Sequence, residues 1–192
     1  MKLKKKSNSK INFLFQKKNI KLISVGRVTD QKDFITILKA LNIVKKSNVE
    51  LVIIGKGEKE IEIKRYIELN NLNKKVRLLG YKKNPFPYIK QADLFLLSSK
   101  FEGLPNVLIE ALCLKKFIIS TDCPTGPKEI LHHGRFGELV KIGDYKKIAK
   151  LIDNFKKTKI VKNKIKDGYK SLKKYNYKIN CEKYYQLIKN YL

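Results

Sequence analysis

Two glutamates, Glu102 and Glu110, bracket a Gly-Leu-Pro turn that lies between an apolar stretch and a helical pattern. The apolar residues 93–97 predict a strand, and a helix that begins at Pro105 is predicted by inward-facing Val107, Leu108, Ala111 and Leu112. Free backbone N–H groups at a helix start attract anions, and open α/β sheets bind ligands beyond the carboxyl ends of their strands. We therefore expect a diphosphate to bind at this turn.

Two cations follow an earlier predicted strand, residues 21–25, and could complete such a site. Arg27 comes directly after Gly26, and Lys32 lies five residues further on. Arg can bond phosphate oxygens in pairs and Lys acts as a point charge, so together they could stabilise a departing diphosphate. The alternative is that both are ordinary solvated cations. Arg27 argues against it, because Arg is scarce in this Lys-dominated chain.

Helix geometry gives the two glutamates different tasks. Glu110 lies about 7 Å along the helix axis from Pro105, at about 1.5 Å per residue, which suits a ribose whose phosphate is at the helix start. Asn106 is one turn earlier on the same face, and the amides of Asn106 and Val107 could share the diphosphate charge. Two alternatives remain open, a glycosidase pair of carboxylates and two ordinary exposed glutamates.

The rest of the chain repeats the alternation of strand and helix. Further strands are predicted at 51–54, 76–79, 117–120 and 137–140, and helices at 34–44, around Ile63, Tyr66 and Ile67, and at 88–91, 127–131 and 145–155. Strands that are apolar on both faces predict a doubly wound, Rossmann-like α/β domain with a parallel sheet. We expect a basic lead-in or linker at 1–19, the domain at 20–156, and C-terminal helices at 157–192 that pack on the sheet or on a partner.

Composition limits the partners of this domain. The chain has 192 residues and a formal net charge of +27, mostly from Lys scattered among Ile and Asn, which is typical of an AT-rich coding bias. Anionic lipid headgroups are the other reading of this charge, whereas sequence-specific nucleic-acid recognition is not expected. Three cysteines without metal or redox spacing fit a reducing cytoplasm. No apolar run approaches the roughly 20 residues of a membrane span, and residues 1–6 lack a signal peptide's apolar core.

Three motifs in the same order resemble one known family. They are Ser24-Val25-Gly26-Arg27 with Lys32, the Glu102-x7-Glu110 spacing within Glu-Gly-Leu-Pro-Asn, and Thr121 to Ile130, which reads Thr-Asp-Cys-Pro-Thr-Gly-Pro-Lys-Glu-Ile. From about residue 21 to 152 the chain resembles the retaining, nucleotide-sugar-dependent glycosyltransferases of family 4, also called group 1. Such enzymes have the two-lobed GT-B architecture. This chain is similar to the C-terminal, donor-binding lobe alone.

The resemblance implies a transferase that uses a UDP-hexose or UDP-N-acetylhexosamine, retains anomeric configuration and builds a surface glycan such as capsule or lipopolysaccharide, or a lipid-linked acceptor. It implies catalytic roles for Arg27, Lys32 and Glu102, with Glu102 on sugar hydroxyls. Donor contacts are expected from Gly26, Tyr81, Lys82, Gly103, Leu104, Asn106, Val107 and Glu110, with the base near Gly80, Tyr81 and Lys82. We expect no metal and no cofactor.

Several readings of the whole protein stay open. The acceptor lobe is a separate chain, or the sequence is a truncated, noncatalytic fragment that binds nucleotide sugars. A basic module for membranes or nucleic acid is the third reading, and it predicts strongly salt-dependent binding without any response to UDP. For the enzyme we expect a cytoplasmic location with peripheral contact at the inner, anionic face of the membrane.

Overall fold

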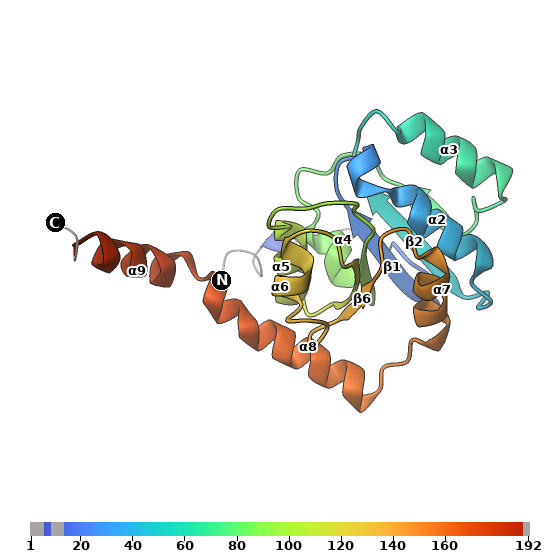
Figure 1. Cartoon of the computed structure of the whole chain (residues 1–192). Coiled ribbons are helices and arrows are strands. Elements are labelled where there is room, and N and C mark those ends of the chain that lie inside the picture. Colours follow the sequence, from blue (N-terminus) through green and yellow to red (C-terminus); the bar gives the residue numbers. More distant parts are fainter. Residues whose placement is uncertain (1–5, 9–13, 190–192) are drawn as a thin grey trace.

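The structure is a computed structural model that describes residues 6–8 and 14–189. Its centre is a six-stranded parallel sheet in the order β3-β2-β1-β4-β5-β6 (Figure 1). The strands are β1 (Ile20–Val25), β2 (Val49–Ile54), β3 (Val76–Leu78), β4 (Leu94–Leu97), β5 (Phe117–Thr121) and β6 (Glu138–Val140). This confirms the predicted doubly wound α/β fold.

The helices cover both faces of this sheet. They are α2 (Phe34–Ile43), α3 (Glu60–Leu69), α4 (Phe86–Gln91), α5 (Asn106–Cys113), α6 (Gly126–Ile130), α7 (Tyr145–Asn154), α8 (Lys159–Ser171) and α9 (Tyr177–Lys189), with short 3-10 helices η1 (Asp30–Lys32) and η2 (Leu172–Tyr175). Each element predicted before residue 156 is present, and where bounds were predicted the ends agree within two residues. The helix after the Gly-Leu-Pro turn begins at Asn106 rather than at Pro105, which adopts an extended conformation as the N-cap residue.

Alternating residues of the buried strands belong to two separate hydrophobic cores, one on each face of the sheet. One face buries Leu22, Leu51 and Leu94 against α2, α3 and α7. The other buries Ile23, Val52, Phe95 and neighbours against α4, α5 and α6. Successive side chains of a strand point to opposite faces, so strands that are apolar at every position require helices on both sides.

The chain reverses its direction of travel across the sheet between β1 and β4. From β1 it proceeds outward to β2 and β3, and then returns to the other side of β1 to form β4, β5 and β6. The loop that leaves β1 leads to α2 on one face of the sheet, and the loop that leaves β4 leads to α5 on the other face. This is the topological switch point at which open α/β sheets bind ligands.

The two ends of the chain differ in how they meet the domain. In the lead-in, Phe15 is buried and the backbone N–H of Leu14 donates to Oε1 of Gln91. At the other end, α8 packs against α5 and β5, whereas α9 extends away from the sheet and contacts η2 (Figure 1). The boundaries at residues 19 and 156 stay predictions, and residues 1–5 and 9–13 lie outside the described part. No described helix has the length and apolar character needed to cross a membrane.

Candidate functional site

An ion pair joins the two loops that flank the switch point. Nζ of Lys32, at the end of η1, lies 2.5 Å from Oε1 of Glu102, on the loop after β4. Both side chains are largely shielded from water, with exposed fractions of 14% for Lys32 and 7% for Glu102. The hydroxyl of Ser99 donates to the same Oε1 at 2.6 Å. Two of the predicted catalytic residues are thus in direct contact.

Further hydrogen bonds keep these two loops together. Nε2 of Gln31 donates to the carbonyl oxygen of Phe101 at 2.9 Å, and the N–H of Lys100 donates to the carbonyl oxygen of Gln31 at 2.8 Å. The hydroxyl of Ser98 donates to the carbonyl oxygen of Lys32 at 2.8 Å. The position of Lys32 relative to Glu102 is therefore fixed by backbone contacts as well as by their own charges.

The start of α5 presents free amides beside this pair. In the described part of the chain, the backbone N–H groups of Asn106 and Val107 have no acceptor, while that of Leu108 donates to the carbonyl oxygen of Pro105. Asn106 is exposed and Val107 is partly exposed. Free N–H groups together with the helix dipole favour a negatively charged ligand at this position.

The loop before α5 is held by the loop after β5. The N–H of Gly126 donates to the carbonyl oxygen of Gly103 at 2.9 Å, and that of Thr125 donates to the carbonyl oxygen of Glu102 at 2.7 Å. A Cβ atom at Gly126 would lie 2.2 Å from the oxygen of Gly103, whereas a Cβ at Gly103 would meet nothing within 4 Å. Gly103 therefore faces open space, and Gly126 permits the close approach that supports it.

Glu110 lies one turn further along α5 than Asn106, so both project from the same side of the helix. Its side chain is partly buried, and among the described residues its carboxylate has neither a hydrogen-bond donor nor a cationic partner. This burial raises the pKa of the Glu110 carboxyl above its ordinary value. A group that donates hydrogen bonds to this carboxylate would therefore relieve a desolvation cost.

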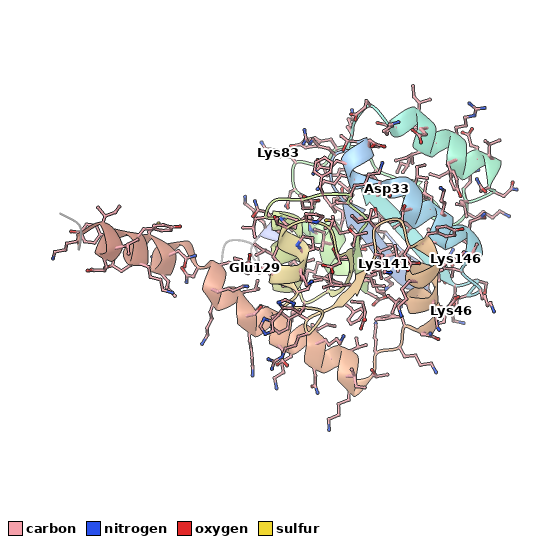
Figure 2. The ribbon with its side chains drawn as sticks, viewed as in Figure 1. Asp33, Lys46, Lys83, Glu129, Lys141 and Lys146 are labelled. Carbon is pink, nitrogen blue, oxygen red and sulfur yellow. The ribbon has the colours of Figure 1, made fainter. Side chains whose placement is uncertain are left out.

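A basic pocket of about 560 Å³ opens at the carboxyl ends of β1, β2 and β3. Its described lining comprises the cations Arg27, Lys56, Lys82 and Lys83, with Tyr81, Pro85, Val25, Ile54, Gly26 and Gly55. No carboxylate is among these residues, so the pocket suits an anionic ligand with an apolar or aromatic part. Figure 2 shows Lys83 and Glu129, which follow β3 and β5 along the chain, on the side of the body opposite Lys46, which precedes β2.

The predicted residues fall into neighbouring groups. Gly26, Arg27, Tyr81 and Lys82 line the basic pocket. The Lys32–Glu102 pair adjoins it, because a Cβ atom at Gly26 would lie 3.2 Å from Cε of Lys32. A third group is formed by Gly103, Leu104, Asn106, Val107 and Glu110, on α5 and the loop before it. Gly103 and Leu104 are exposed, and none of this third group is in the pocket lining.

Sequence reasoning missed three residues of this region. Ser99 binds Glu102, and Lys56 and Lys83 add charge to the basic pocket. Lys56 lies between Gly55 and Gly57, and the chain approaches its neighbour closely here, because a Cβ at Gly57 would lie 2.3 Å from the carbonyl oxygen of Val28. The position of Ser99 just after a buried strand was the available signal for a site residue.

Metal-ligating side chains do not gather in the described residues, where no group of three or more His, Cys, Asp or Glu is placed to hold an ion. Arg27 is exposed at the pocket, and its guanidinium has no hydrogen-bond or ion-pair partner in that part of the chain. The positive groups that the described residues offer a bound anion include cationic side chains and the helix amides of α5. A reaction without metal stays a prediction.

The sequence matches a family model over most of its length. The model for glycosyl transferases group 1 aligns with residues 5–178. The chain belongs to this family. Among curated relatives, an N-acetylgalactosaminyltransferase of Campylobacter jejuni that acts on a diphospho-undecaprenol-linked saccharide is 32% identical over 80% of this chain and 43% of its own length. A glycosyltransferase of Methanocaldococcus jannaschii is 40% identical over 62% of this chain and 33% of its own.

Solved structures of glycosyltransferases share the fold. A mutant of Staphylococcus aureus TarM, in complex with fondaparinux, alpha-GlcNAc-glycerol and UDP, superposes with a TM-score of 0.80 at 23% identity, covering 87% of this chain and 35% of its own. The chain thus spans 33% to 43% of the length of these three proteins.

Proposed function

We propose that this group 1 chain is the donor-binding lobe of a retaining, family 4 glycosyltransferase with the GT-B architecture. The observation that carries the proposal is the meeting, across the switch point, of Lys32 with Glu102 beside the basic pocket. A nucleotide-sugar site needs cations that bind the diphosphate and a hydrogen-bond acceptor for the sugar hydroxyls. The loop after β1 would supply the cations, and Glu102 on the loop after β4 would supply the acceptor. The ligand we propose is a UDP-hexose or a UDP-N-acetylhexosamine, since UDP is bound in TarM.

The diphosphate would bind between the β1 loop and the start of α5. Arg27 can bond two phosphate oxygens, because its exposed guanidinium has no ion pair or hydrogen bond among the described residues that would first have to break. The ammonium of Lys32 has three N–H donors, so it can bond a phosphate oxygen and still hold Glu102. The amides of Asn106 and Val107 would take part of the remaining charge.

The two carboxylates would hold the two sugars of the donor. Glu102 precedes α5, on the phosphate side of the proposed site, and would accept hydrogen bonds from hydroxyls of the transferred sugar. Glu110 would accept from the vicinal hydroxyls of ribose, which would offset its desolvation. The base would lie in the basic pocket, near Tyr81 and Lys82.

Catalysis by this lobe would consist of leaving-group stabilisation. The bond between the anomeric carbon and the diphosphate oxygen breaks, the acceptor oxygen bonds to that carbon, and the proton of the acceptor hydroxyl passes to an oxygen of the departing diphosphate. Arg27, Lys32 and the α5 amides stabilise the negative charge that develops on the departing diphosphate without a metal. Retention of configuration and an acceptor on a surface glycan or a lipid carrier are parts of the proposal that rest on the family resemblance.

The acceptor would be bound by a second lobe, because the chain spans less than half of the relatives described above. We further propose that the protein works in the cytoplasm at an anionic membrane surface, as its net charge of +27 favours. The competing readings are a noncatalytic fragment that binds nucleotide sugars and a basic module that does not bind them.

The proposal is tested by calorimetric titration with UDP-glucose, UDP-galactose, UDP-GlcNAc and UDP-GalNAc at about 150 mM salt. ADP-glucose and GDP-mannose serve as matched controls of equal charge. We expect saturable binding of at least one UDP-sugar, at least about tenfold tighter than either control. Equal binding of all six, falling steeply with salt, would instead support the basic module.

A further inference from the structure

Ser99 is a buried hydroxyl that the proposed donor chemistry has not used. It lies just after β4 with no exposed surface, and its Oγ donates to Oε1 of Glu102 at 2.6 Å. Its own carbonyl oxygen accepts a hydrogen bond of 2.6 Å from Oγ1 of Thr121, a residue of β5 that is also fully buried. A chain of hydrogen bonds thus runs from β5 through Ser99 to the carboxylate.

The two donors to Glu102 differ in how firmly they are held. Lys32 reaches Oε1 with a long, flexible side chain, and a diphosphate at the β1 loop would attract the same ammonium. Ser99 has one short side-chain rotor in a fully buried position, so its hydroxyl stays near Oε1 whatever Lys32 does. Ser99 is therefore the donor that can hold the carboxylate while the ammonium is shared with phosphate.

Pinning one oxygen of a carboxylate also sets the direction of the other. With Oε1 bonded to Ser99 and Lys32, the described residues provide no donor to Oε2 of Glu102. Because a carboxylate accepts through both oxygens, Oε2 remains available for an external donor such as a sugar hydroxyl. Preorganised acceptors of this kind cost a ligand little in reorganisation.

We propose that Ser99 is a positioning residue that orients Glu102 toward the transferred sugar, and that Thr121 holds Ser99 in place. The inference rests on the proposed function, because it assumes that Glu102 contacts the donor sugar. Ser99 itself touches neither sugar nor phosphate in this proposal. Its loss should therefore affect recognition of the sugar and leave recognition of UDP unchanged.

The test measures two affinities by calorimetry, one for UDP and one for the UDP-sugar that the wild type binds most tightly. The quantity compared is the ratio of the affinity for the UDP-sugar to the affinity for UDP. Ser99→Ala should lower the affinity for the UDP-sugar about tenfold and change that for UDP by less than about twofold, since one hydrogen bond to a charged group is lost. Ser24→Ala is the matched control. Ser24 is 2% exposed and donates to the carbonyl oxygen of Leu96 at 2.7 Å, away from Glu102.

Thr121→Val gives a second reading should Ser99→Ala fold poorly, because it keeps the Ser99 hydroxyl and removes only its support. It should lower the same ratio by about two- to fivefold. In a Glu102→Gln background, neither substitution should change the ratio further, because both act through the carboxylate.

Three outcomes would overturn the inference. An unchanged ratio in Ser99→Ala, an equal loss for UDP and UDP-sugar, or a full effect in the Glu102→Gln background would each show that Ser99 does not act through Glu102 on the sugar. Binding of UDP by the wild type separates this failure from a failure of the proposed function. A wild type that does not bind UDP would reject both.

Discussion

At the scale of single residues, Glu110 combines partial burial with the lack of a partner in the described chain. Because burial raises its folded pKa, the carboxyl costs no stability below its ordinary pKa. The cost develops as pH rises from there and is complete above the raised value. Such a cost is typical of a group whose partner is a ligand rather than the fold.

Glu110→Gln should therefore weaken UDP binding by about tenfold while raising thermal stability at neutral pH. Hydroxyl donors favour the charged carboxylate, so wild-type affinity relative to the variant should fall as pH is lowered through the raised pKa. Isothermal calorimetry from about pH 4 to 8 measures the two affinities, with 2′,3′-dideoxy-UDP as control, and scanning calorimetry measures thermal stability. If the variant loses affinity for the dideoxy nucleotide just as strongly, Glu110 does not hold the ribose.

Arg27→Ala should reduce affinity for UDP by about ten- to hundredfold and affinity for uridine by less than twofold, because charge-assisted bonds to phosphate are worth about 1.5–3 kcal/mol. Arg65 on α3 is also exposed and provides the control substitution. The measurement is calorimetry with both ligands. Parallel losses for UDP and uridine would reject the phosphate role.

The sequence indicated which residues are candidates for the site, but not which of them are in contact. Arg27, Lys32, Glu102 and Glu110 follow from strand ends and helix spacing, which are local patterns. That Lys32 pairs with Glu102 was not predicted, because the two are 70 residues apart and their distance depends on which strands are neighbours. Ser99 was missed for the same reason.

At the scale of elements, the site depends on one loop supporting another. The segment before α5 rests on the loop after β5 through the hydrogen bonds of Thr125 and Gly126. Gly126 is the point of closest approach, and Gly103 on the opposite loop faces open space. The two glycines therefore have different structural demands although both flank the same contact.

Gly126→Ala should destabilise the protein by about 1–3 kcal/mol, because its Cβ would overlap the oxygen of Gly103 and Cδ of Pro105. Gly103→Ala should change stability by less than about 0.5 kcal/mol, since its Cβ meets no atom. Denaturant unfolding of both variants measures the difference. Similar stability losses would show that the tight contact at Gly126 does not determine how the loops pack.

Element positions were predictable where the apolar pattern is strong. The buried strands are continuous apolar runs, so their existence and their parallel pairing follow from composition and from the intervening helices. The start of α5 was placed one residue early, because Pro105 was assigned to the first helical turn and in fact precedes it. Of the C-terminal helices that were predicted to pack on the sheet or on a partner, α8 packs on β5. α9 does not follow it, since its apolar residues Tyr184, Leu187 and Ile188 are exposed, and its packing on a partner stays a prediction.

At the scale of the whole molecule, the chain belongs to the group 1 family and spans less than half the length of the relatives described above. Its charge of +27 is spread over a Lys-rich surface and does not by itself define a site. What distinguishes the proposed site from that surface is the burial of Lys32 and Glu102 and the topology that brings them together.

The isolated chain should transfer no sugar to any acceptor, because nothing in the proposed donor site positions a nucleophile. Addition of an acceptor lobe from a family relative should restore transfer with retained configuration. Sugar transfer is measured with a radiolabelled UDP-sugar and a lipid-linked saccharide acceptor. The control is a parallel reaction in which Arg27→Ala replaces the wild-type chain. Turnover by the wild-type chain alone would overturn the idea that catalysis needs a second lobe.

The central claim is that a nucleoside diphosphate binds at the switch point of the sheet. Backbone NMR of the 22.4 kDa chain during titration with UDP tests it most directly. We predict saturable shifts for the amides of Gly26, Arg27, Lys32, Gly103, Asn106, Val107 and Glu110 that persist at about 300 mM salt. Shifts scattered over the Lys-rich surface that vanish at this salt concentration, with none at the start of α5, would contradict the claim.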